Sequence, residues 1–170
     1  MSLIVNINII SNNAPDDNTT ISELGDGTRG IDGGAPRAYA QWISMQIKNL
    51  LGNASIKIQN ADAKWGKFYK DGNKGDELSS GTINGIVIAP NFTSTVAACG
   101  RSSASSGTEG TIDLYDGTVR ICTLYWNCPW GKKSNKFEKR NVNSNYLVTI
   151  GSWNSDSGAI GNVNIDVERY

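Results

Sequence analysis

The residues best suited to bind a ligand lie close together in residues 125–134, which read Tyr-Trp-Asn-Cys-Pro-Trp-Gly-Lys-Lys-Ser. The proline and the glycine of this segment indicate a strand that ends in a loop. Tryptophan favours places where one side of its ring is apolar and the other is wet. Beside lysines, such rings predict a surface for a membrane interface, or for an anionic, quaternary-ammonium or sugar ligand. The alternative is that these aromatic rings form a small hydrophobic cluster beside the main core, with the lysines exposed to solvent next to it.

Three acidic residues, Glu109, Asp113 and Asp116, are candidates for the carboxylate pair of a glycoside hydrolase. A hairpin turn expected at Asp116 already explains that residue, which weakens the catalytic interpretation. The sequence contains no histidine, so catalytic triads and metal sites that use histidine are excluded. We therefore predict that the protein is not an enzyme.

An acidic loop at residues 71–77, Asp-Gly-Asn-Lys-Gly-Asp-Glu, superficially resembles a calcium-binding loop. It departs from the EF-hand pattern, because Gly75 is its fifth residue and Thr82 its twelfth, so a tight turn is the simpler interpretation. The three cysteines have no CxxC spacing and predict reduced thiols, rather than a disulfide framework or a zinc site. We predict no metal and no other cofactor.

Charge and hydropathy narrow the range of partners. Sixteen basic and sixteen acidic residues cancel, so the sequence predicts no nucleic-acid partner. No apolar run approaches the roughly 20 residues of a membrane-spanning helix, and the first residues lack the cationic region of a signal peptide. We expect a protein that is soluble as made, is released without a signal peptide, and binds membranes only peripherally.

Short segments of alternating apolar and polar residues, separated by turn residues, predict an all-β fold with a single antiparallel β-sandwich. In residues 38–50, Ile43, Met45 and Ile47 face one way, whereas Trp42 lies on the polar side. Further strands are expected around residues 56–58, 65–69, 83–88, 95–99, 145–150 and 162–167, with a hairpin over 112–126. No segment keeps a helical period over a useful length.

The first 37 residues differ in character from the rest. Residues 1–10 alternate like a strand, whereas residues 11–37 are rich in Asn, Asp, Gly, Thr and Pro and resemble a linker. We therefore divide the chain into an N-terminal extension, 1–37, and a sandwich domain, 38–170. An edge strand at 1–10 is expected to dock on the domain or on a partner subunit.

Seven short motifs occur together in the order, and roughly with the spacing, of one known family. They are AYAQW at 38–42, AKWGK at 63–67, DGNK at 71–74, CGRS at 99–102, SGTEG at 106–110, YWNCPWGKK at 125–133 and DSGAIG at 156–161. In these motifs the sequence resembles the aegerolysin family over residues 38–170.

This resemblance implies a β-sandwich similar in architecture to the actinoporin-type cytolysins. It implies binding to a membrane sphingolipid, either sphingomyelin with cholesterol or ceramide phosphoethanolamine. It also implies a haemolysin-like or insecticidal toxin subunit, which acts with a larger membrane-attack-complex/perforin protein that forms the pore. By motif position Trp42, Trp65, Trp126, Trp130 and Lys133 match the family's lipid-facing aromatic residues and base. We also expect Tyr125 in the lipid-binding site, together with Glu109, since a primary ammonium group would need an acceptor such as Glu109 or Asp113. Ser106 departs from the acidic residue of some fungal members and leaves the preferred headgroup open.

A second function from a different class remains open on the residues alone. Exposed tryptophans on a β-sandwich also stack on the faces of pyranose rings, so the alternative is a carbohydrate-binding module. A glycan array distinguishes the two functions, since glycan binding that survives without lipid and is lost in Trp130→Ala would favour the carbohydrate-binding module.

Overall fold

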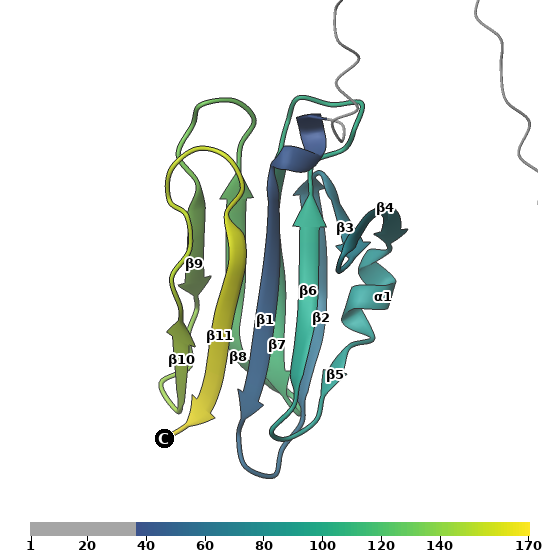
Figure 1. Ribbon diagram of the computed structural model, residues 1–170. Helices are drawn as coiled ribbons and strands as arrows, with labels where there is room; N and C mark the ends of the chain where they lie inside the picture. The colour runs from purple at the N-terminus through teal and green to yellow at the C-terminus, as the bar shows by residue number, and fades with distance from the viewer. Residues whose placement is uncertain (1–36) are drawn as a thin grey trace, which may run out of the picture. The chain divides into compact units, whose positions relative to one another are not determined.

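The computed structural model describes residues 37–170, which form two β-sheets packed face to face (Figure 1). The predicted strand at 1–10 and nearly all of the predicted linker at 11–37 lie outside the described residues. The domain boundary at residue 37 therefore stays a prediction. The elements are η1 Arg37–Ala40, β1 Trp42–Leu50, β2 Ile56–Trp65, β3 Lys67–Lys70, β4 Asn73–Leu78, α1 Ser80–Asn84, β5 Val87–Ile88, β6 Thr93–Cys99, β7 Thr108–Asp116, β8 Val119–Cys128, β9 Lys136–Arg140, β10 Tyr146–Ile150 and β11 Gly161–Arg169.

The predicted β-sandwich is confirmed, with one difference in strand direction. One sheet has the order β10-β11-β1-β6-β3-β4, and the other has the order β5-β2-β7-β8-β9. Within residues 37–170 every strand pairing is antiparallel except that of β1 with β11, which runs parallel from Ile43 opposite Gly161 to Leu50 opposite Glu168. A parallel pair needs a crossover connection, and here most of the domain separates the two strands.

The core lies between the sheets and follows the alternation of the strands. Ile43, Met45 and Ile47 are fully buried, which confirms the inward face predicted for β1. The facing sheet contributes Ile112 and Leu114, also fully buried, from the predicted hairpin. Burying an aliphatic side chain of this size contributes about 1.5–3 kcal/mol, so this alternation holds the two sheets together.

The structure differs from the sequence prediction in three short segments. Ile83, expected in a strand, lies in helix α1, because the Ser79 side chain accepts a hydrogen bond from the Thr82 backbone N–H and caps the first turn. β4 occupies part of the expected turn at 71–75. β9 was not expected, because Phe137 is its one apolar residue among charged ones.

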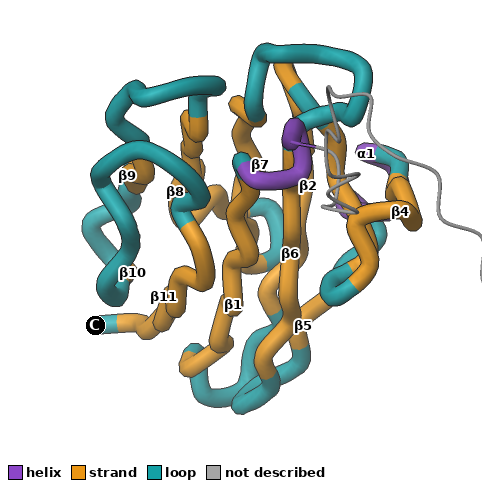
Figure 2. The backbone as a smooth tube through the Cα atoms, turned by 45° about the horizontal axis from the view of Figure 1, so that its top comes forward, coloured by secondary structure: helices purple, strands orange, loops and turns teal. Residues whose placement is uncertain are grey.

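Gly66 is the point at which the chain passes from one sheet to the other. Trp65 ends β2 in the five-stranded sheet, and Lys67 begins β3 in the six-stranded sheet. Gly66 has φ +81°, and a Cβ there would lie 2.3 Å from the backbone oxygen of Cys99. Only glycine fits this conformation and this close approach. In Figure 2 the short helix η1, in purple, lies at the end of the sandwich where β1 begins.

Candidate lipid-binding site

Trp65 is the most exposed of the predicted aromatic site residues, with 51% of its surface accessible. It lies directly opposite Glu109 of β7, after a register shift in the pairing of β2 with β7. Side chains directly opposite one another in a sheet share one face and are near neighbours. The outer face of the five-stranded sheet therefore presents an indole ring beside a carboxylate.

Glu109 is held in place by its neighbours on the same face. The Tyr125 hydroxyl donates to Glu109 Oε1 at 3.0 Å, and Lys64 Nζ lies 3.4 Å from the same oxygen. The Glu109 side chain is only 18% exposed. Its other oxygen, Oε2, accepts no hydrogen bond from residues 37–170. The carboxylate therefore keeps one oxygen for a ligand.

The Tyr125 ring is covered by a cation from β9. The guanidinium carbon of Arg140 lies 3.6 Å from the ring centroid, and Arg140 also pairs with Glu138 at 2.5 Å. The hydrogen bond from Arg140 is the main reason why the pKa of Glu138 is lowered. Tyr125 is thus fixed at both ends, by Glu109 at its hydroxyl and by Arg140 over its ring.

Trp126 was expected among the lipid-binding residues, but its ring lies inside the sandwich. It is fully buried, its Nε1–H donates to Thr108 Oγ1 at 3.0 Å, and its ring packs edge-to-face on Phe68 at 5.7 Å. Gly110 makes room for it, because a Cβ there would lie 2.5 Å from the indole. Adjacent residues of a strand face opposite ways, so Tyr125 and Trp126 cannot both be outside. Trp126 supports the outer face of the sheet from inside without being part of that face.

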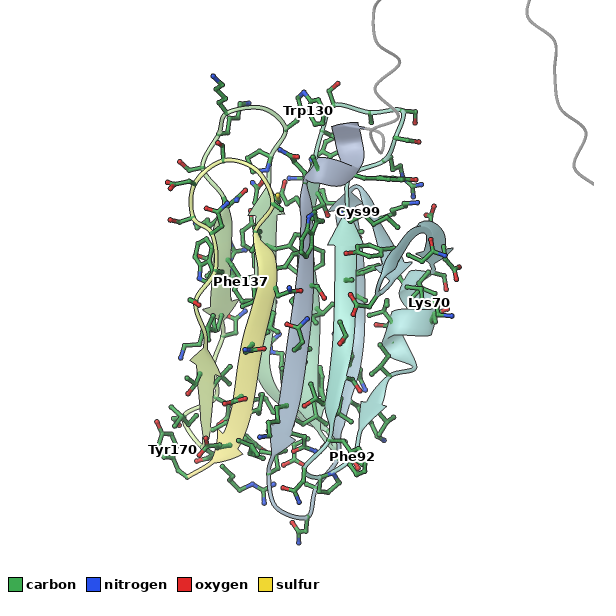
Figure 3. The ribbon with its side chains drawn as sticks, in the orientation of Figure 1. Lys70, Phe92, Cys99, Trp130, Phe137 and Tyr170 are labelled. Carbon is green, nitrogen blue, oxygen red and sulfur yellow. The ribbon has the colours of Figure 1, made fainter. Side chains whose placement is uncertain are left out.

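Trp130 and Lys133 lie in the loop that follows β8, and Figure 3 shows Trp130 at one end of the sandwich. Trp130 is half-buried and Lys133 is exposed. The loop is tied down by Asn135, whose Nδ2 donates to the backbone oxygens of Asn154 and Gly158 at 3.0 Å each. Trp130 therefore lies in a loop whose conformation is held by the hydrogen bonds of Asn135.

The backbone of Gly107 brings Trp130 and Trp65 to the same end of the molecule. A Cβ at Gly107 would lie 2.9 Å from the Trp130 nitrogen, and a Cβ at Gly66, next to Trp65, would lie 3.0 Å from the Gly107 oxygen. Three chain segments thus touch at one place. Five of the predicted residues share this end of the five-stranded sheet: Trp65, Glu109, Tyr125, Trp130 and Lys133.

Trp42 belongs to a different surface. It lies on the outer face of the six-stranded sheet, packed against the small cluster of Tyr69, Ala97 and Cys99. Lys74 Nζ lies 4.7 Å from the centroid of its ring. The outward position predicted for Trp42 is correct, but the structure does not join it to Trp65 on one face.

The cysteines are protonated thiols within the domain. Cys99, Cys122 and Cys128 are free and buried, as expected for reduced cysteines. Burial raises the pKa of Cys128 to about 11 and that of Cys122 to about 12. Neither thiol is a nucleophile at neutral pH.

The described residues contain neither a cluster of metal ligands nor a helix that could span a membrane. No group of three or more histidine, cysteine, aspartate or glutamate side chains in residues 37–170 is placed to hold a metal ion. Within the same residues, no helix has the length and apolar character needed to cross a membrane.

Comparison with known proteins gives the family. The family model described as Aegerolysin matches residues 40–170. The chain is an aegerolysin. Asp-hemolysin of Aspergillus fumigatus is 46% identical to it over 133 residues, which cover 78% of this chain and 96% of that protein. Ostreolysin A6 of Pleurotus ostreatus is 39% identical over 132 residues, covering 76% of this chain and 95% of that protein.

Solved structures of similar proteins share the fold of this aegerolysin. IP-1A from Alcaligenes faecalis is 42% identical, with a TM-score of 0.71 over 78% of this chain and 94% of that one. RahU protein, solved in complex with a TRIS molecule, is 32% identical, with a TM-score of 0.75 over 78% of this chain and 98% of that one. The names of the relatives support a haemolysin-like aegerolysin.

The structure adds residues to the site that sequence reasoning missed. Lys64 and Arg140, which hold Glu109 and Tyr125, were not expected there. Lys64 directly precedes Trp65 in the sequence, and this position could have indicated that Lys64 belongs to the candidate site. Arg140 comes from β9, and its place beside Tyr125 follows only from the pairing of two strands.

Proposed function

We propose that this aegerolysin is the membrane-binding component of a cytolysin, haemolysin-like or insecticidal, and that it recognises a membrane sphingolipid. The ligand is sphingomyelin with cholesterol, or ceramide phosphoethanolamine. Binding is peripheral, through the end of the five-stranded sheet that carries Trp65 and Trp130. A larger membrane-attack-complex/perforin protein supplies the pore, a role that follows from the resemblance to the family.

One observation carries the proposal: the half-exposed Trp65 ring stands beside the Glu109–Tyr125 pair. An indole ring with one face exposed to water and the other packed on protein can lie at the level of the lipid headgroups in a membrane. A carboxylate with a free oxygen accepts hydrogen bonds from an ammonium group. The face thus offers an apolar anchor next to a cation acceptor.

The loop at 129–134 adds the opposite charge. Lys133 is exposed, and its ammonium attracts a lipid phosphate as a compact point charge. Trp130, on the same supported loop, is a second ring for the interface. Glu109 and Lys133 together suit a zwitterionic headgroup, in which a phosphate and an ammonium lie a few bonds apart.

Co-sedimentation with liposomes tests this proposal. Vesicles of phosphatidylcholine alone are compared with vesicles that contain sphingomyelin and cholesterol or ceramide phosphoethanolamine. We expect the protein to pellet only with vesicles of the last two kinds. Failure to bind any sphingolipid-containing vesicle would contradict the proposal.

Substitutions locate the binding face. Trp65→Ala should reduce vesicle binding, whereas Phe92→Ala should not. Phe92 is a matched control, because it is 67% exposed and lies at the end of the sandwich opposite Trp130 (Figure 3). Release of a trapped dye, measured with and without an added perforin-type partner, then separates binding from lysis.

A carbohydrate-binding module remains the second candidate, because the exposed Trp65 ring beside a carboxylate also suits a pyranose. A glycan array distinguishes the two functions. Glycan binding that persists without lipid, and is lost in Trp65→Ala and Trp130→Ala, would favour the sugar. Absence of glycan binding together with sphingolipid binding would favour the lipid.

A further inference from the structure

A recess lies on the outer face of the six-stranded sheet, beside the β3–β4 hairpin. It has a volume of about 500 Å³, which is in the range of small-ligand sites. The sheet is low at this place, because the short side chains of Ser44 and Ala97 lie between Asn162 and Tyr69 in one row across four strands. The residues that line the recess are Tyr39, Trp42, Tyr69, Asp71, Gly72, Asn73, Lys74, Gly75 and Asn162.

Tyr69 brings a free hydroxyl to the recess. The residue is only 3% exposed, and its hydroxyl makes no hydrogen bond with residues 37–170. Within the same residues, the fully enclosed side-chain polar atoms that lack a partner belong to Gln41 and Asn135, so the Tyr69 hydroxyl is open to the recess. Burial raises the pKa of Tyr69, so the hydroxyl keeps its proton and can donate to a ligand.

Two lysines contact the aromatic rings of the recess wall. Lys74 Nζ lies 4.7 Å from the centroid of the Trp42 ring and donates to the Tyr39 backbone oxygen at 2.9 Å. Lys67 is only 7% exposed, and its Nζ lies 5.1 Å from the centroid of the Tyr39 ring. Neither lysine forms an ion pair within 4.0 Å with a carboxylate of residues 37–170. Burial lowers the pKa of Lys74, and a bound anion would oppose this effect.

Asp71 supplies the one carboxylate among the residues that line the recess. Its Oδ1 accepts from Ser44 Oγ at 3.0 Å, and its Oδ2 accepts no hydrogen bond from residues 37–170. Glu77, on the same hairpin, is already paired with Arg101 at 2.6 Å. The side chains that line the recess or contact its aromatic rings thus carry two ammonium groups and one carboxylate. This surplus of positive charge favours a ligand with one negative charge.

We propose that the recess binds an acidic sugar, a pyranose that carries one carboxylate. The carboxylate of the sugar accepts hydrogen bonds from Lys74. The ring hydroxyls, which both donate and accept, pair with the free Oδ2 of Asp71 and the free hydroxyl of Tyr69. A phosphate is less well suited, because the lining residues include no arginine to bind it with two parallel hydrogen bonds.

The inference does not rest on the proposed function. The recess lies on the sheet opposite Trp65, and its selectivity depends on Lys74 and Asp71. It also differs from the carbohydrate-binding alternative at Trp65, because it requires a charged sugar. The acidic sugar is either a free molecule or the terminal residue of a glycan.

NMR titration of the full chain tests the inference, with the indole N–H signals of Trp42 and Trp65 reporting on the two sheets. The probes are D-glucuronate and D-galacturonate, and D-glucose and D-galactose are their matched neutral sugars. We expect at least one acid to shift the Trp42 signal with saturation, and its neutral counterpart to bind at least about fivefold more weakly. No shift with either acid, equal affinity for acid and neutral sugar, or tighter binding of inorganic phosphate would overturn the inference.

Lys74→Gln tests the charge that the acid requires. It should weaken binding of the acid about tenfold or more and leave the weak binding of the neutral sugar nearly unchanged. Lys74→Arg, which keeps the charge, should retain preference for the acid. Lys70→Gln is the matched control, since Lys70 is exposed on the same hairpin but does not line the recess. Equal losses in Lys74→Gln and Lys70→Gln, or full binding by Lys74→Gln, would contradict the assignment.

Tyr69→Phe tests the recess without disturbing the packing of the ring. The Tyr69 hydroxyl has no partner in residues 37–170, so its removal should leave the melting temperature nearly unchanged. Binding of the acid and of the neutral sugar should both weaken about fivefold, because the lost contact is to a group that the two sugars share. Unchanged binding of both sugars by this variant would place the site elsewhere.

A glycan array and vesicles complete the test. Binding to glycans that end in a uronic or sialic acid, lost in Lys74→Gln but kept in Trp65→Ala, would identify a terminal residue as the source. Binding of the monosaccharides alone would identify a free acid. Sphingolipid binding without any binding of an acidic sugar at Trp42 would refute the recess and leave the proposed function intact. Binding of an acidic sugar without sphingolipid binding would do the reverse.

Discussion

Tyr125 and Trp126 are neighbours in β8, and their side chains serve opposite faces of one sheet. The Tyr125 hydroxyl donates to Glu109 on the outer face, whereas the Trp126 indole donates to Thr108 in the core. Each contact reaches across to β7, to two adjacent residues of that strand. The proposed binding face and the core are therefore fixed by the same strand pair, and substitutions at these two positions should have different effects.

Trp126→Ala should act on stability. The variant leaves a cavity under Phe68 and an unpaired Thr108 hydroxyl, and it should lower the free energy of unfolding by about 3–5 kcal/mol. Urea denaturation measures this change. A variant as stable as wild type would show that the ring is not part of the core.

Trp65→Ala should act on binding instead. Loss of a half-exposed interfacial ring removes about 1–3 kcal/mol, which corresponds to a roughly 5- to 150-fold weaker affinity for sphingolipid vesicles. The free energy of unfolding should change by less than about 0.5 kcal/mol, because the site is on the surface. Unchanged vesicle binding would place the lipid site elsewhere on the sandwich.

Glu109→Gln should change selectivity between headgroups. The variant keeps an oxygen for the Tyr125 hydroxyl but loses the charge that attracts an ammonium group. Affinity should fall more for ceramide phosphoethanolamine, whose ammonium donates hydrogen bonds, than for sphingomyelin. The ratio of the two vesicle affinities is the measurement, and an equal fall for both lipids would argue against a contact between Glu109 and the ammonium.

Lys133→Ala should reduce affinity in a salt-dependent way. An exposed lysine contributes little to folding, so the melting temperature should stay nearly constant. Its attraction to phosphate is screened at high ionic strength, so the difference from wild type should shrink as salt is added. Lys132→Ala, at the adjacent exposed position, is the control. A loss that does not depend on salt would assign Lys133 a structural role.

Cys128 should make the protein sensitive to alkali. Burial raises its pKa from an ordinary value of 9.0 to about 11, so the folded state holds the proton more tightly than the unfolded state. This contribution to stability is complete below pH 9 and is lost as the pH rises toward 11. Melting temperatures of wild type and Cys128→Ala across this range provide the test. The decline should be shallower in the variant, and identical curves would contradict the expectation.

The strands were predictable from sequence where one face is strongly apolar. Ile43, Met45 and Ile47 show this, because alternation with polar neighbours allows only one buried face. β9 was missed because one inward Phe137 leaves no visible alternation. Trp126 was predicted to face the lipid because of its position in the family motif, but it is buried. Successive side chains of a strand point to opposite faces, so either Tyr125 or Trp126 had to point inward.

The recess on the outer face of the six-stranded sheet, which Trp42, Asp71 and Lys74 help to line, could not be predicted from sequence at all. Asn162, Ser44 and Tyr69 are far apart in the chain and meet only because β11, β1, β6 and β3 are adjacent in the sheet. Asp71 was interpreted as a turn residue, which is correct locally. Its charge gains significance only through the position of Lys74 in the finished sheet.

The parallel pairing of β1 with β11 has a consequence for synthesis of the chain. β1 is the earliest strand of the described domain to leave the ribosome, and β11 is the last. Until β11 emerges, one long side of β1 has no hydrogen-bonding partner, and Met45 and Ile47 lack the neighbours that β11 provides. Such non-local contacts form slowly. Until β11 has been synthesised, the nascent domain can therefore be bound by chaperones or can aggregate with other chains.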